Sequence, residues 1–246
     1  MRLTDTHCHL DLDRFDQDRD QVIERALAAG LERLLMPAIH LESARRIQRL
    51  VRQHPTIYGA VGIHPLDATS WNESSPDEIR DIIQQDRQHF MQKKFVAIGE
   101  IGLDHYWQEV PHDVQEHALR EQLELASELN LPVIIHMREK GDQPEGSCYE
   151  KLGPILLEWT QKLHVNKSPL ANRPGVLHSF SGSVQVAQEV LNLGFYIGMT
   201  GPITYKNASL KIEVVKSLPL DKILIETDSP FLSPMPFRGK RNEPGY

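Results

Sequence analysis

Two histidines near the start of the chain, His7 and His9, have the spacing of metal ligands. They follow a short apolar segment at residues 1–3, and side chains two positions apart on a strand point to the same side. Neutral imidazole is a common protein ligand for divalent metals. The same pair can also be two surface histidines, so the prediction depends on further ligands elsewhere. Cys8, between them, is expected to face the opposite side.

Further candidate ligands stand where short apolar segments end. These residues are His64, Glu100, His136, His178 and Asp228, which follow the segments 57–62, 95–99, 131–135, 175–177 and 223–227. Polar residues scattered at random would fall at strand starts and on helix faces just as often. Their placement at segment ends therefore favours a shared metal site.

The apolar segments alternate with amphipathic ones. Helices are predicted over residues 16–29, 41–54, 76–93, 114–129, 184–192 and 209–217, and two more strands over 32–38 and 195–199. Short, continuously apolar strands are typical of a parallel sheet buried on both faces. About eight β/α units predict a single α/β domain over 1–246, a TIM (β/α)8 barrel, whose active site lies at the carboxyl ends of the strands. An open doubly wound sheet is the alternative, weakened because the sequence has no glycine-rich phosphate loop.

The ligand set suits two divalent ions that share one carboxylate. We expect Glu100 to bridge the ions, with His7, His9 and Asp228 completing one site and His136 and His178 the other. Mixed nitrogen and oxygen ligands leave Mg, Mn, Zn and Co possible. Two such ions activate water and stabilise charge on a phosphoryl or carbonyl oxygen, and Asp228 could accept the water proton.

Four other residues are candidate substrate contacts because of their position near the predicted rim. They are His64 before Pro65, Arg138 two residues after His136, Tyr205 after the seventh strand, and Arg238 in a basic cluster with Lys240 and Arg241. Asp104 is expected to be a turn or supporting carboxylate rather than a metal ligand.

The composition limits partners and location. The net charge of −7 argues against a broad basic surface for nucleic acid, although metal ions could supply local positive charge for an anionic substrate. The sequence has no apolar run near the roughly 20 residues that span a bilayer and no signal-peptide core. With two cysteines, it is expected to be a cytoplasmic protein without membrane partners.

The motifs together resemble the TatD family of metal-dependent hydrolases. The resemblance rests on residues 4–10, 60–65, 97–104, 135–138, 178–182 and 226–230, with 238–244 matching a late motif. It implies an amidohydrolase-like TIM barrel and deoxyribonuclease activity, often 3′→5′ exonucleolytic. It also implies a divalent-metal centre with the ligands His7, His9, Glu100, His136, His178 and Asp228.

The sequence departs from that family in two places. The stretch 139–174 is long for a connection between the fifth and sixth strands and is expected to lie beside the active-site rim as a helix between two exposed loops. The sequence ends at Tyr246, 18 residues past Asp228, where the family continues into a helix that covers the last strand. The final helix of the barrel is therefore expected to be missing.

These observations predict a monomeric two-metal hydrolase that cleaves phosphodiester bonds at single-stranded DNA ends. The alternative is hydrolysis of an ester, amide or lactone, including deacylation of aminoacyl-tRNA, because a carbonyl substrate needs the same activated water. A non-catalytic metal-binding or scaffold protein would be expected to lack a ligand, and none is missing.

Overall fold

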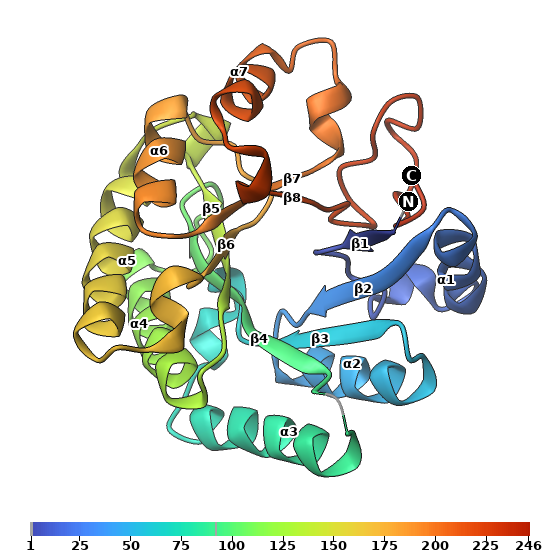
Figure 1. Cartoon of the computed structure of the whole chain (residues 1–246), viewed down its shortest axis with the longest axis horizontal. Helices are drawn as coiled ribbons and strands as arrows, with labels where there is room; N and C mark the ends of the chain where they lie inside the picture. Colours follow the sequence, from blue (N-terminus) through green and yellow to red (C-terminus); the bar gives the residue numbers. More distant parts are fainter. Residues whose placement is uncertain (1, 92) are drawn as a thin grey trace.

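Eight parallel strands follow one another around a single sheet in the computed structural model, which describes residues 2–91 and 93–246 (Figure 1). They are β1 (Leu3–Asp5), β2 (Leu31–Pro37), β3 (Ile57–Val61), β4 (Phe95–Asp104), β5 (Val133–Arg138), β6 (Gly175–Leu177), β7 (Tyr196–Met199) and β8 (Ile223–Ile225). Each strand pairs in parallel with the next. The predicted (β/α)8 barrel is confirmed, and an open doubly wound sheet is excluded by this order.

The gap between β8 and β1 is bridged by the segments that follow these strands. The amide of Thr6 donates to the carbonyl of Ile225 over 3.2 Å, and the amide of Asp228 donates to the carbonyl of His7 over 2.8 Å. The amide of His9 donates to the carbonyl of Ser229 over 2.7 Å. These bonds nearly close the barrel and place the His7–His9 segment beside Asp228.

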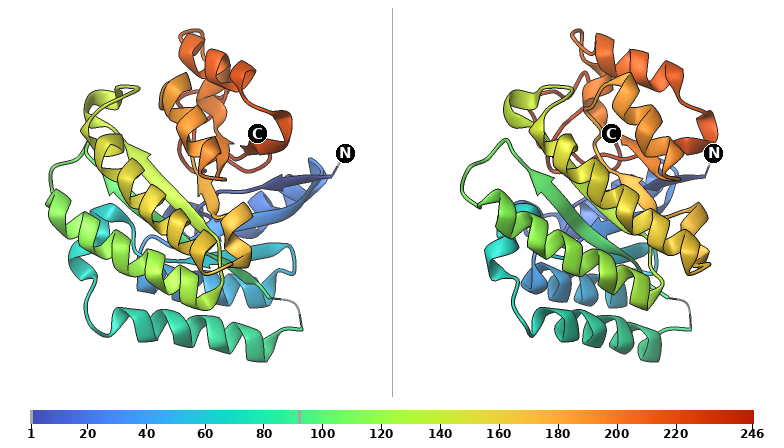
Figure 2. Two further views of the ribbon diagram at one scale, coloured as in Figure 1. Left: turned by 60° about the vertical axis from the view of Figure 1, so that its left-hand side comes forward. Right: turned by 90° about the vertical axis from the view of Figure 1, so that its left-hand side faces the viewer.

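Within the described part of the chain, seven α-helices cover the outside of the sheet (Figures 1 and 2). They are α1 (Arg19–Ala28), α2 (Leu41–Gln53), α3 (Ser75–His89), α4 (His112–Leu129), α5 (Ser147–Val165), α6 (Val184–Asn192) and α7 (Ser209–Ser217). The start of α2 illustrates the local causes, because the His40 ring accepts a hydrogen bond from the amide of Ser43 over 3.0 Å. Its apolar positions Ala44 and Ile47 are buried against the barrel. The predicted helices are confirmed, and α6 and α7 have the predicted bounds. Helix α3 ends at His89, so its predicted extension to residue 93 was wrong for the described residues, and residue 92 lies outside them.

Strand β4 is longer than predicted, since it runs through Glu100 to Asp104. Ile101 and Leu103 continue the ladder with β5 and are buried. A Cβ atom on Gly102 would lie 2.0 Å from the carbonyl oxygen of His136, so only glycine allows the two strands to approach this closely. Glu100 therefore projects from the middle of a rigid strand. By contrast, β1 and β8 end at Asp5 and Ile225, before their candidate ligands.

Most of the stretch 139–174 is helix α5, which packs outside the barrel against α4, β4 and β5 (Figure 2). The carboxylate of Glu139 is buried and accepts the amides of Cys148 and Tyr149 at the start of α5, over 3.0 and 2.7 Å. Leu170, after the helix, is also buried. Most residues of the two flanking loops, 140–146 and 166–173, are nevertheless exposed, as predicted, and the first of these loops lies at the carboxyl ends of the strands.

No helix follows β8 within residues 226–246, all of which the structure describes (Figure 1). The side of β8 is correspondingly open, with Ile225 54% exposed. The final segment returns to α1, where Arg241 pairs with Asp18 over 2.6 Å and Glu243 pairs with Arg25 over 2.8 Å. Among the described residues, none of the helices has the length and hydropathy to cross a bilayer.

Candidate metal centre

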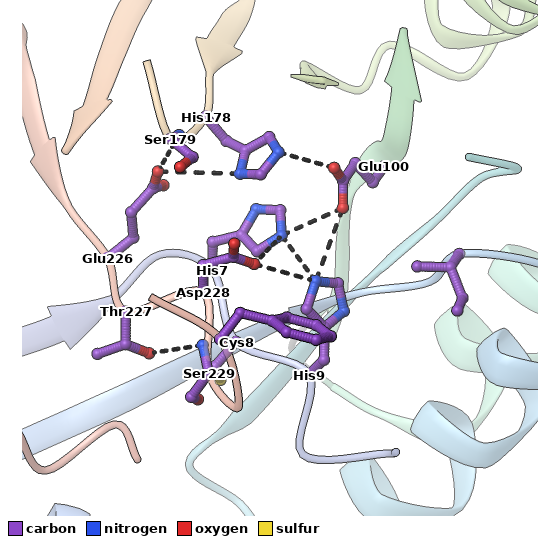
Figure 3. A network of polar contacts seen from close by, with 12 residues as sticks. His7, Cys8, His9, Glu100, His178, Ser179, Glu226, Thr227, Asp228 and Ser229 are labelled. Carbon is purple, nitrogen blue, oxygen red and sulfur yellow. Dashed lines mark hydrogen bonds and ion pairs between the residues drawn. The ribbon is translucent and has the colours of Figure 1, made fainter. Parts of the chain in front are cut away.

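The six predicted ligands lie together at the carboxyl ends of the strands, around the Glu100 carboxylate. Figure 3 shows five of them, without His136. On one side, Nε2 of His7 and Nε2 of His9 are 3.0 Å apart. The Oε2 atom of Glu100 lies 3.2 Å from His7 Nε2 and 3.7 Å from His9 Nε2. Asp228 Oδ1 lies 3.7 and 3.5 Å from the same two nitrogens. Two imidazole nitrogens and two carboxylate oxygens therefore face a common point.

The second oxygen of Glu100 faces a second group of imidazoles. Its Oε1 atom lies 2.7 Å from Nε2 of His178, 2.8 Å from Nδ1 of His136 and 3.5 Å from Nε2 of His64. Glu100 is buried, with its side chain 4% exposed. Its two oxygens thus belong to two different donor groups, as a bridging carboxylate requires.

Three sets of donor atoms are close enough to hold an ion, with all atoms of a set within 4.8 Å of one another. They are His7, His9 and Glu100; His7, His178 and Asp228; and His64, Glu100 and His136. The grouping differs from the predicted one, because His178 also falls with His7, whose ring stacks on it at 3.9 Å. His64, predicted as a substrate contact, lies among the donors. The donor types and their burial fit divalent ions such as Mn or Zn.

Asp104 holds His136 from behind. Its Oδ2 atom is 2.9 Å from Nε2 of His136, so Nδ1 is left to face Glu100. The other oxygen accepts the amides of Tyr106 and Trp107 over 2.9 and 3.0 Å, and Gln115 bonds the Asp104 backbone. A carboxylate on the far nitrogen fixes the tautomer and orientation of a ligating histidine. The expected supporting role of Asp104 agrees with this geometry.

Glu226 lies on the far side of the His178 ring from Glu100, as Asp104 does for His136, but at a longer distance. Its Oε1 atom lies 3.9 Å from Nδ1 of His178 and accepts the amide of Ser179 (Figure 3). The carboxylate rests on β7 at Gly198, where a Cβ atom would lie 2.5 Å from Oε1. Sequence reasoning did not single out Glu226. Its place two residues before Asp228 is the only sequence signal that points to the site.

Asp5 was also missed, because Thr227, with which it makes two hydrogen bonds, is far away in the sequence. Its carboxylate accepts the amide and the hydroxyl of Thr227 over 3.0 and 2.6 Å, and the amide of His7 over 3.1 Å. One buried side chain therefore fixes both the His7–His9 segment and the segment that carries Asp228.

Burial and the neighbouring charges shift several pKa values. Burial lowers the pKa of His7 to about 4, which keeps its ring neutral and able to bind metal. Burial opposes the charged form of His9 and His136, yet hydrogen bonds to Asp228 and to Asp104, respectively, raise their pKa to about 9. The pKa of Glu100 is well below its usual range because the surrounding histidines outweigh its burial. Without metal, protons on His9 and His136 thus offset the negative charge of the carboxylates, and a bound metal cation would displace these protons.

Among the described residues, the other predicted substrate contacts, Arg138, Tyr205 and Arg238, interact with residues outside the three donor sets. Arg138 pairs with Asp142 over 2.8 Å and lies over the ring of Tyr106. Arg238 lies over the ring of Tyr205, whose hydroxyl donates to the carbonyl of Ser233. Arg241, in the same basic cluster as Arg238, pairs with the acidic side chains of Asp18 and Glu243. Cys8 is buried with its thiol 3.6 Å from the carbonyl of Leu35, away from the ligands as expected.

Known proteins are similar to this chain in sequence and fold over almost its whole length. A family model described as TatD related DNase matches residues 4–246. The uncharacterized metal-dependent hydrolase YabD of Bacillus subtilis (strain 168) is 40% identical over 244 residues, covering 99% of this chain and 86% of YabD. A 3′-5′ ssDNA/RNA exonuclease TatD of Escherichia fergusonii is 34% identical over 248 residues, covering 98% of this chain and 86% of that protein. The crystal structure of YjjV, a TatD homolog from Escherichia coli K12, has a TM-score of 0.83 and 33% identity, covering 99% of this chain and 85% of that chain. The chain therefore belongs to the TatD family of metal-dependent hydrolases.

Proposed function

We propose that the protein is a two-metal exonuclease that removes nucleotides from the 3′ end of single-stranded nucleic acid. The observation that carries this proposal is the Glu100 carboxylate, whose two oxygens face two separate groups of histidines. The bridge would be Glu100, with His7, His9 and Asp228 on one ion and His136 and His178 on the other. His64 is close enough to serve the second ion or the substrate.

Each protein group has a definite task in this reaction. Divalent ions bound here lower the pKa of a water molecule and neutralise charge on a phosphoryl oxygen. Asp228 is the carboxylate of the set with the more exposed side chain, 15% against 4% for Glu100. Although burial opposes it, the His9 hydrogen bond lowers the pKa of Asp228, so the group is ionised at neutral pH and can accept the proton of the attacking water.

The relatives support nucleic acid as the substrate, since several are named 3′-5′ ssDNA/RNA exonucleases. The second candidate is hydrolysis of a carboxylic ester or amide, including aminoacyl-tRNA. The donor set favours neither, because a carbonyl substrate uses the same activated water. The two are separated by offering both substrates to one preparation.

The test uses chelator-stripped protein and 5′-labelled single-stranded DNA and RNA, with Mg²⁺ or Mn²⁺ added back. A ladder that shortens from the 3′ end only with metal supports the proposal. Asp228→Asn should abolish the ladder, whereas Asp221→Asn, the same change on an exposed turn, should retain it. Intact nucleic acid with hydrolysis of an aminoacyl ester would contradict the nuclease assignment.

A further inference from the structure

Beside the metal centre, Phe231 presents an aromatic ring that the fold does not bury. The ring is 43% exposed and lies edge-on to the His9 ring, with 6.5 Å between centroids. Single exposed apolar side chains are common on protein surfaces. This one is distinguished by its contact with a candidate metal ligand and by the rigidity of its backbone.

The backbone of Phe231 is held from both sides. Its amide donates to the carbonyl of Asp228 over 2.9 Å, and its carbonyl accepts the side-chain amide of Asn242 over 2.6 Å. Asn242 is fully buried and also donates to the carbonyl of Thr227 over 2.8 Å. The backbone that carries the ring is thus held at the same turn that presents Asp228, close to the candidate metal centre.

A guanidinium group accompanies this ring. Arg14, in the short turn Asp13–Phe15 after β1, lies over the Phe231 ring at 5.3 Å from its centroid. No ion pair between described residues includes Arg14, whereas Arg138, which covers Tyr106 near the same rim, is neutralised by Asp142. The pair at Phe231 therefore combines an aromatic face with a cation that has no acidic partner among residues 2–91 and 93–246.

An aromatic ring beside a cation is the chemistry that binds a nucleobase and its phosphate without reading sequence. We infer that Phe231 and Arg14 form the binding site for the base of a nucleotide adjoining the scissile bond. The ring would stack on the base, and Arg14 would contact a neighbouring phosphate. This inference rests on the proposed nuclease activity, and it adds a contact to the base that a purely phosphate-directed site lacks.

The kinetic test compares Phe231→Ala with the wild type on a normal oligonucleotide and on one whose last two nucleotides are abasic. Loss of stacking should raise KM about tenfold on the normal substrate and leave KM on the abasic substrate unchanged. Phe231→Trp should retain the wild-type KM, and Phe231→Leu, which lacks a π face, should behave like Phe231→Ala. Tyr246→Ala is the matched control, because Tyr246 is 45% exposed but lines a cavity with Leu3 and Leu31, at the starts of β1 and β2.

A binding test provides a readout that needs no turnover. Oligonucleotides carry 2-aminopurine at the last or the penultimate position, with phosphorothioate linkages that resist cleavage. We expect the wild-type protein with Mn²⁺ to quench the fluorescence at one of the two positions, and Phe231→Ala to lose the quench. Arg14→Gln should retain the quench at saturation and reduce the salt dependence of binding.

The outcomes separate the two proposals. If the wild type cleaves neither DNA nor RNA with metal bound, the nuclease assignment fails. The base site is wrong if the wild type cleaves nucleic acid and Phe231→Ala changes KM equally on the normal and the abasic oligonucleotide. It is also wrong if Phe231→Ala leaves the fluorescence quench intact. Unchanged thermal unfolding of Phe231→Ala is expected from the exposure of the ring and excludes misfolding as the cause.

Discussion

The two sides of the candidate metal centre are built differently. On the β4–β5 side, Glu100 and His136 project from strands of ten and six residues, and Asp104 holds His136 at 2.9 Å. On the β6–β8 side, both strands have three residues, and Glu226 lies 3.9 Å from His178. Nδ1 of His178 and Oε2 of Glu226 are buried without a hydrogen-bond partner among the described atoms.

This difference indicates which part of the candidate metal centre is preorganised. Long strands and a fully bonded carboxylate fix the β4–β5 donors before any ion binds. The β6–β8 donors depend on segments beyond the ends of short strands, tied together by Asp5 and Thr227. We therefore expect the ion held by Glu100, His136 and His178 to bind more tightly than the ion held by His7, His9 and Asp228.

The largest effect is expected from Glu100→Gln, which removes the group shared by both sides. The amide cannot supply the negative charge that faces His7, His136 and His178. Both ions should be lost on dialysis, and the rate should fall by about 10³-fold or more, since metal catalysis contributes several kcal/mol. Metal analysis and the nuclease assay measure this. Glu213→Gln, on the exposed side of α7, is the control, and retention of two ions by Glu100→Gln would contradict the bridging role.

A smaller effect is expected from Asp104→Asn on the preorganised side. The change weakens the hydrogen bond that orients His136, and such supporting residues typically contribute 10- to 100-fold to metal affinity, roughly. Titration calorimetry with Mn²⁺ should show the tighter site weakened by about that factor and the other site unaffected. Asp81→Asn, on the exposed face of α3, should bind like the wild type. Equal weakening of both sites would remove the distinction between the two sides.

Glu226→Gln should weaken the same ion, through its ligand His178, and by less than Asp104→Asn. At 3.9 Å the carboxylate makes no hydrogen bond to His178, so its removal costs less orientation of the ligand. The same titration should show a decrease of a few-fold, below about tenfold, in the affinity of the tighter site. A larger loss than that of Asp104→Asn would mean that metal binding draws Glu226 onto His178.

The smallest effect is expected from Arg241→Met, which releases the final segment from α1. Arg241 is 30% exposed, and such pairs contribute about 0.2–1 kcal/mol to the free energy of unfolding. The hydrogen bond from Arg241 lowers the pKa of Asp18. Burial opposes ionisation of Glu243, but the hydrogen bonds from Arg25 and Arg241 outweigh it and lower the pKa of Glu243. Their contribution is therefore present above the ordinary carboxyl pKa and is lost as pH falls through the lowered values. Urea unfolding over a series of pH values should show a difference between variant and wild type that is full at pH 7 and shrinks as the pH falls below the ordinary carboxyl pKa.

The sequence alone predicted where the candidate metal centre lies, because the carboxyl ends of the strands in a barrel share one rim. His64, His136 and His178 follow predicted strands, and this regularity survives errors of a few residues in the strand bounds. The end of β4 was misjudged because Glu100 interrupts an apolar run, although Ile101 and Leu103 continue it. A buried charge inside a strand is unusual unless a partner or a metal compensates it.

Other parts of the site could not be predicted, because they depend on contacts across the whole chain. Asp5 and Thr227 are 222 positions apart, yet one hydrogen bond of 2.6 Å joins them. The position of Glu226 depends on the space left by Gly198 on a neighbouring strand. Nothing local to these residues distinguishes them from surface carboxylates.

The central claim is a dinuclear centre bridged by Glu100 that cleaves single-stranded nucleic acid. The most direct measurement adds Mn²⁺ stepwise to stripped protein and follows bound metal by electron paramagnetic resonance and cleavage of single-stranded DNA in the same samples. We predict two binding events of unequal affinity, spin coupling between the ions when both are bound, and activity that rises with the second equivalent. Full activity with one equivalent, or two bound ions without coupling or cleavage, would contradict the account.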